Sequence, residues 1–149
     1  MNCGWPRASA VLLALASLPP ALAAQGREAG ASAFTTTARA TTAGLLVHAG
    51  LRPGGSAPRL VLALGGGAAD GGMVGRGEFV AHLLLPHAPG AGVAFYLGGG
   101  IAGVTGPEEA GWLVALVGVE TAPGRANGFA LEVGVGGGAR LSAGWRRRW

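Results

Sequence analysis

The chain has 149 residues, of which 50% are hydrophobic and only 12% are charged. Because the surface of a small water-soluble domain usually carries about 25–35% charged residues, this composition argues against an ordinary soluble domain. The formal net charge of +4 comes from arginine without any lysine, and no recognisable nucleic-acid-binding module accompanies it, so nucleic acid is not an expected partner.

The N-terminal residues are typical of a cleavable signal peptide. Residues 1–7 carry one positive charge, residues 8–18 are apolar, and Ala21-Leu22-Ala23 fits a cleavage signal. A transmembrane anchor is the alternative, but the apolar run is well short of the roughly 20 residues that span a bilayer. We therefore expect a signal peptide over residues 1–24 and one β-barrel domain over residues 25–149.

Beyond this segment, no apolar run approaches the length of a transmembrane helix, about 18 residues. Turn-forming residues instead divide the chain into segments of roughly eight to eleven residues, the spacing of consecutive antiparallel strands. We expect an all-β fold, an eight-stranded antiparallel up-and-down barrel with both of its ends on one side. The expected strands cover residues 34–42, 44–52, 59–65, 78–85, 93–101, 112–121, 129–135 and 139–149, with a loop at 66–77.

The two faces of these strands differ in size and polarity. Large apolar residues alternate with small residues and isolated charges, as in Val93-Ala-Phe-Tyr-Leu-Gly98. A soluble barrel turns its large residues inward and needs a charged exterior, whereas small residues with isolated charges suit a narrow lumen. The alternation therefore favours a barrel whose large apolar residues face lipid.

The last eleven residues alternate strictly and stop on an aromatic residue. One face carries Leu141, Ala143, Trp145 and Trp149, and the other carries mainly arginine, serine and glycine. The segment resembles the closing strand of bacterial outer-membrane β-barrel proteins, apart from Arg147, which stands where many members have an aromatic residue. The resemblance implies that this strand is an insertion signal, that the protein lies in the outer membrane, and that its partners are outer-membrane lipid and the assembly machinery.

Four charges fall on the inward face of the last three expected strands. The alternation places Glu120, Glu132, Arg140 and Arg146 in the lumen, where we expect a buried ion-pair network. Breaking one buried pair costs roughly 3–5 kcal/mol, so such a network would act as a fixed plug. The alternative is that these charges sit at strand ends in water and pair with nothing.

No catalytic, cofactor or metal site is expected. The three Gly-Gly-Gly stretches lack the lysine and the strand-then-helix setting of a phosphate loop. His82 and Glu78 share a strand face, but no set of three ligands has the spacing of a metal site. Ser142 is expected in the lumen with no histidine beside it, which argues against a hydrolase or acyltransferase.

Together these observations predict an outer-membrane barrel with a structural or surface-interaction role, a lumen plugged by ion pairs, and no catalysis. Loops around Asp70 and Glu108-Glu109 would bind another surface component, which the sequence does not identify. The alternative is a secreted or periplasmic, soluble, lipocalin-like barrel that holds an apolar ligand. The polarity of the two strand faces distinguishes the membrane barrel from the soluble barrel, because only a membrane barrel is apolar outside.

Overall fold

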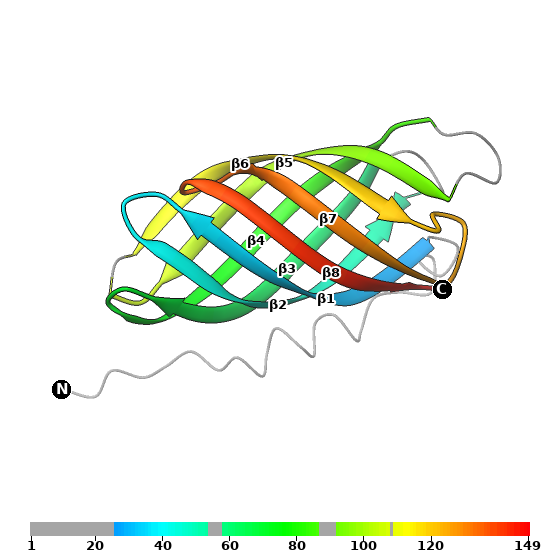
Figure 1. Ribbon diagram of the computed structural model, residues 1–149. Coiled ribbons are helices and arrows are strands. Elements are labelled where there is room, and N and C mark those ends of the chain that lie inside the picture. Colours follow the sequence, from blue (N-terminus) through cyan, green and yellow to red (C-terminus); the bar gives the residue numbers. More distant parts are fainter. Residues whose placement is uncertain (1–25, 54–57, 87–91, 108) are drawn as a thin grey trace.

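The computed structural model describes residues 26–53, 58–86, 92–107 and 109–149, which form a closed barrel of eight antiparallel strands (Figure 1). Each strand pairs with the next along the chain, and β8 closes the barrel against β1. The strands are β1 (Gly26–Thr37), β2 (Thr41–Arg52), β3 (Pro58–Ala69), β4 (Gly72–Leu84), β5 (Val93–Thr105), β6 (Ala110–Thr121), β7 (Asn127–Val135) and β8 (Ala139–Arg148). The expected all-β, up-and-down architecture is confirmed.

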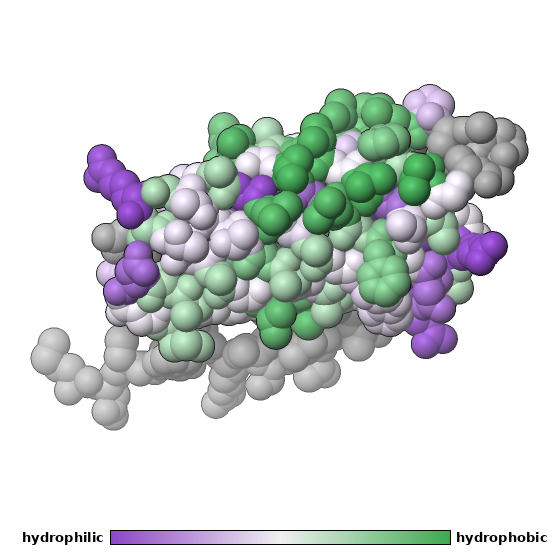
Figure 2. Space-filling view, in the orientation of Figure 1, coloured by the Kyte–Doolittle hydropathy of each residue, from purple (hydrophilic) through white to green (hydrophobic). Residues whose placement is uncertain are grey.

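The outer wall of the barrel follows from the alternation within each strand. In β5, Tyr96 is buried while Phe95 and Leu97 are exposed on the outside. The antiparallel register gathers such outward residues into a continuous surface, since Leu97 lies between Leu83 of β4 and Val117 of β6. Figure 2 shows hydrophobic side chains over the middle of the visible wall, with most hydrophilic ones projecting at its two ends.

The interior of the barrel is not an apolar core. Its buried apolar residues include two small clusters: Val80, Tyr96, Ala102, Val114 and Leu116 form one, and Phe34, Leu46 and Ala63 form the other. Among the described residues, eleven buried side chains are polar or charged, against twelve that are hydrophobic. The lumen therefore has to satisfy many polar groups away from water.

The expected first strand at 34–42 is wrong. β1 is Gly26–Thr37, and the chain turns at residues 38–40 before β2 begins. The stretch Gly30-Ala31-Ser32 has little intrinsic preference for a strand. It is nevertheless strand because β1 fits closely between its neighbours, where a Cβ at Gly30 would overlap the carbonyl oxygen of Trp145 and the ring of His48. Tertiary packing overrides the local preference.

The expected loop at 66–77 is also wrong, because most of it is strand. β3 continues to Ala69 and β4 begins at Gly72, so only Asp70 and Gly71 connect them. A Cβ at Gly65 or Gly67 would overlap carbonyl oxygens of β2. This glycine run therefore marks close contact between paired strands and not a turn.

The remaining strands include the expected segments but for a few terminal residues, and several begin earlier or end later. The turns between β1 and β2 and between β3 and β4 lie at one end of the barrel, named here the Asp70 end. The opposite, Arg52 end holds the connection from β6 to β7, together with Gly26 and Trp149. The expected signal peptide lies outside the described residues, as do residues 54–57, 87–91 and 108, which include Glu108 of an expected binding loop.

Candidate functional site in the barrel lumen

The lumen holds eight buried charged residues that come from six strands. They are Glu28, Arg59, Arg76, Glu78, Glu120, Glu132, Arg140 and Arg146. Each occupies an inward position of the alternation, so the pattern that turns large apolar residues outward also buries these charges. Four glutamates face four arginines, and burial of this kind is tolerated only when the charges are paired and hydrogen-bonded.

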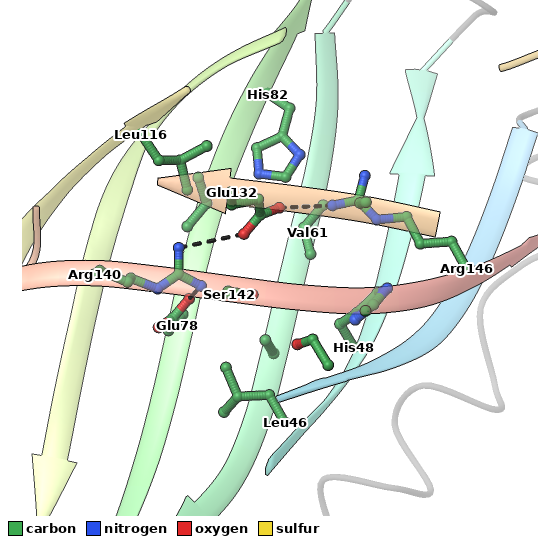
Figure 3. Close-up of a pocket in the computed structure, with 15 residues that line it drawn as sticks. Leu46, His48, Val61, Glu78, His82, Leu116, Glu132, Arg140, Ser142 and Arg146 are labelled. Carbon is green, nitrogen blue, oxygen red and sulfur yellow. Dashed lines mark hydrogen bonds and ion pairs between the residues drawn. The ribbon is translucent and has the colours of Figure 1, made fainter. Parts of the chain in front are cut away.

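Toward the Asp70 end, the ion pairs run from β4 across to β8 and β7. Arg76 Nε donates to Glu78 Oε1 at 2.6 Å, and Arg140 Nη2 donates to Glu78 Oε2 at 3.0 Å. The other terminal nitrogen of Arg140 donates to Glu132 Oε2 at 3.3 Å. Each carboxylate in this half is therefore held between two guanidinium groups, as the dashed lines in Figure 3 show for Glu132.

The middle of the network is organised around Tyr96. Its hydroxyl donates to Glu132 Oε1 at 2.7 Å and accepts a hydrogen bond from Arg146 Nη2 at 2.9 Å. Arg146 Nη2 also donates to Glu132 Oε1 at 2.7 Å. The guanidinium groups of Arg59 and Arg146 lie 4.9 and 5.2 Å from the centre of the Tyr96 ring, and His82 stacks against that ring. Tyr96 thus links the two halves of the lumen.

Toward the Arg52 end, several arginines converge on Glu120. Its Oε2 atom lies 2.7 Å from Arg59, 3.2 Å from Arg146 and 3.1 Å from Arg148, and its Oε1 atom lies 3.7 Å from Arg52. The second carboxylate here is Glu28, whose Oε2 atom lies 3.3 Å from Arg59 and 3.7 Å from Arg148. The pairs from Arg76 through to Arg148 form one continuous network along the lumen.

A small cavity of about 30 Å³ remains inside the network, lined in part by His48, His82 and Ser142 (Figure 3). This volume holds about two water molecules. Arg59 donates two hydrogen bonds to Nδ1 of His82, at 3.3 and 2.9 Å. The cavity is therefore a pocket of water size, lined by apolar side chains as well as by groups that the network already holds in place.

The four lumen charges singled out in the sequence all lie in this network. Glu120, Glu132, Arg140 and Arg146 are each at most 7% exposed, and ion pairs connect all four. The alternation from Ala110 to Arg148 was sufficient to place them, because those strands lie close to their expected positions. Their partners across the barrel could not be read from spacing.

Sequence reasoning missed four further members of the network, Glu28, Arg59, Arg76 and Glu78. Glu28 precedes the wrongly expected first strand, and Arg76 lies inside the wrongly expected loop. Glu78 was considered only as a metal ligand. A signal was present for these residues, since the i to i+2 spacing of Arg76 and Glu78 places both on one face of a strand. Extending the alternation through the glycines would have found them.

The expected insertion strand corresponds to β8. Leu141, Ala143, Trp145 and Trp149 are all exposed, whereas Arg140, Ser142 and Arg146 of the same strand are buried. Arg147 is exposed on the outer surface, at the Arg52 end. Trp112, by contrast, has the inward position in β6, and its ring lies beside Gly137. This inward position keeps Trp112 out of any aromatic belt on the outer wall.

The residues that the structure describes contain no group of three or more histidine, cysteine, aspartate or glutamate residues able to hold a metal ion. Within the same ranges, no helix is long and apolar enough to cross a membrane.

Comparison with known proteins identifies a fold neighbour. No family model and no curated protein sequence matches the chain. Among solved structures, the chain is similar to the crystal structure of Neisserial surface protein A, with a TM-score of 0.60 and 15% sequence identity. The match covers 85% of this chain and 97% of that protein. The two proteins therefore share the closed barrel fold over nearly the whole length of the neighbour.

Proposed function

We propose that the chain is a small barrel of the bacterial outer membrane, with a structural or surface-interaction role, a lumen closed by ion pairs, and no catalytic activity. Its partners in this proposal are the lipid around the wall and the machinery that inserts it. The observation that carries the proposal is the inverted polarity of the barrel. Similarity of fold to a Neisserial surface protein supports it.

The inversion places large apolar side chains outside and charges inside. Among the described residues, 21 large hydrophobic side chains are exposed, including Leu113 at 81% and Phe129 at 66%. Arg59 and Glu120, in contrast, have no exposed surface. Soluble proteins rarely expose apolar patches of such extent, whereas a wall in contact with lipid requires them. The arrangement suits a hydrocarbon surrounding.

The closed sheet suits a bilayer for a second reason. Lipid offers no hydrogen-bonding groups, so a chain that spans it must satisfy its backbone internally. Here every strand pairs with a neighbour on each side around the barrel, which leaves no open sheet edge. The strands have 9 to 13 residues, and about 9–11 suffice for a tilted strand to cross a membrane.

The paired charges and the small cavity of the lumen support a barrel without an open channel and without catalysis. Each buried glutamate is held by arginine, so it is already engaged and poorly suited to act as a general base. The internal cavity, at about 30 Å³, is too small for the apolar ligand of a lipocalin-like barrel. This observation favours the membrane reading over the soluble one.

A surface-interaction role would use the Asp70 end. In the orientation that we adopt from other bacterial outer-membrane barrels, both ends of the domain lie in the periplasm, so the Asp70 end faces the outside. Arg39, Asp70 and Glu109 are exposed at this end, together with Met73. Their charges and the apolar side chain of Met73 form the surface that an external partner would meet.

The first test of the proposal is the gel mobility of membrane-fraction protein in detergent, with and without boiling. We expect the unheated protein to migrate differently from the boiled one, because a closed barrel resists detergent until heat opens it. Protein that is soluble without detergent and shows no shift would overturn the membrane reading.

A second test uses the depth dependence of lipid contact. Leu131 is exposed at the centre of β7, and Val93 is exposed at the first position of β5. In lipid, Leu131→Arg should lower the free energy of unfolding by about 2–4 kcal/mol, while Val93→Arg should cost about 0–1 kcal/mol. A soluble barrel would tolerate both substitutions equally.

A further inference from the structure

A basin opens at the Arg52 end of the barrel and has an unusual lining. Its volume is about 360 Å³, and its wall includes Arg27, Arg52, Arg125 and Arg148. Glu28 is the acidic side chain of the same lining. Four arginine side chains therefore stand against one glutamate side chain. The basin lies at the end of the ion-pair network, and Glu28, Arg52 and Arg148 belong to both.

The glutamates of the lumen neutralise only part of the charge of these arginines. Glu28 and Glu120 are the carboxylates within reach, and both already face Arg59, which is fully buried. Arg148 lies 3.1 Å from Glu120 and 3.7 Å from Glu28, whereas Arg52 reaches Glu120 only at 3.7 Å. The positive charge at the mouth therefore exceeds what the nearby glutamates balance.

Buried guanidinium nitrogens without a good hydrogen bond also indicate an excess of positive charge at the mouth. Several guanidinium nitrogens at the mouth are buried and make no hydrogen bond of good geometry: Nε of Arg27, Nη2 of Arg52, and Nε and Nη2 of Arg148. Of these atoms, Nη2 of Arg148 has a close ion pair, at 3.1 Å from Glu120. Buried donors are rarely left without an acceptor, and each such group costs stability. A small rearrangement of these side chains toward an acceptor in the basin would satisfy them.

We propose that the basin at the Arg52 end binds an anion of the phosphate class. The planar fork of arginine matches the oxygens of phosphate, and several forks around one basin suit a group that carries more than one negative charge. The exposed side chain of Trp149 lines the rim of the basin. The bound group is either a free phosphate or the phosphate of a lipid at the membrane surface, since tryptophan is common at that interface.

The experiment titrates the refolded protein in an uncharged maltoside detergent, by calorimetry, with two probes. Inorganic pyrophosphate represents the free phosphate, and a short-chain phosphatidic acid represents the lipid. The test variant is Arg52→Gln combined with Arg125→Gln, and the control is Arg39→Gln, which removes an exposed arginine at the Asp70 end. Charge-assisted hydrogen bonds are lost only in the test variant, so we expect binding to weaken by at least roughly tenfold.

The two probes separate the sources of the phosphate. Binding of pyrophosphate by the control variant, with the loss in the double variant, identifies a free phosphate. Binding of phosphatidic acid with the same loss, and weak binding of pyrophosphate, identifies a lipid headgroup. Absence of saturable binding by either probe, or equal binding by the control and the double variant, overturns the proposal.

Folding of each variant is checked by its heat-dependent gel mobility before titration. Should the double variant fail to form the barrel, Arg125→Gln alone replaces it, because Arg125 is exposed on the turn between β6 and β7. The test requires the barrel fold but not a membrane location. A negative result therefore removes the phosphate site and leaves the proposed function standing.

Discussion

The two halves of the lumen use the same residue types with different balance. Toward the Asp70 end, Arg76 and Arg140 alternate with Glu78 and Glu132, so every buried charge has an opposite neighbour. Toward the Arg52 end, the single carboxylate of Glu120 lies within 4 Å of four arginines. The comparison shows that the charges of one network can balance where the lumen is enclosed, while positive charge is left over where the lumen opens. The first half suits closure, and the second suits recognition of an anion.

The largest effect is expected from Glu120→Gln, because it removes the carboxylate that holds the arginines of the Arg52 half together. We expect the free energy of unfolding to fall by about 4–5 kcal/mol, at the upper end for a broken buried pair. Urea unfolding of the refolded barrel measures this free energy. Glu109→Gln is the matched control, since Glu109 is exposed. Equal stability of the two variants would contradict the central role of Glu120.

A somewhat smaller loss, about 3 kcal/mol, is expected from Arg76→Gln in the balanced half, because Glu78 then keeps only Arg140. Combining Arg76→Gln with Glu78→Gln should cost less than the sum of the single changes, since each single change leaves a buried charge poorly paired. The same unfolding assay gives the four values of the cycle. Simple additivity would mean that the two side chains do not form a buried pair.

Tyr96→Phe tests how the two halves are connected. The variant keeps the ring that lies against Arg59 and Arg146 but removes the hydroxyl hydrogen bonds to Glu132 and Arg146. We expect a loss of about 1.5–3 kcal/mol, typical of hydrogen bonds to charged groups. Thermal unfolding in detergent is the measurement. An unchanged melting temperature would show that the ring, and not the hydroxyl, supports the network.

The smallest effect is expected from Arg52→Gln, which should change stability by no more than about 0.5 kcal/mol. Arg52 is partly exposed and lies 3.7 Å from Glu120, among arginines that repel it. Losing one cation from this half removes repulsion as well as attraction. A large loss in the unfolding assay would show that the Arg52 half is as tightly balanced as the Asp70 half.

Much of the fold could be predicted because alternation is a local property. In β5, β7 and β8 the outward residues form an uninterrupted series, and a strand with that pattern has only one side to place in lipid. The prediction failed where small residues weaken the pattern, at Gly30 in β1 and at Gly65–Gly67 in β3. At these positions the reason for glycine is the closeness of the neighbouring backbone, which no local pattern records.

The sequence by itself determined the class of fold, the number of strands, and the inward position of Glu120, Glu132, Arg140 and Arg146. Only the tertiary structure decided which charges meet, since Arg140 and Glu78 are 62 residues apart and become partners through closure of the barrel. It also decided that arginines gather in excess at the Arg52 end. The physical reason is that strand periodicity selects a side chain's face, whereas the register of eight strands in a ring selects its neighbours across the lumen.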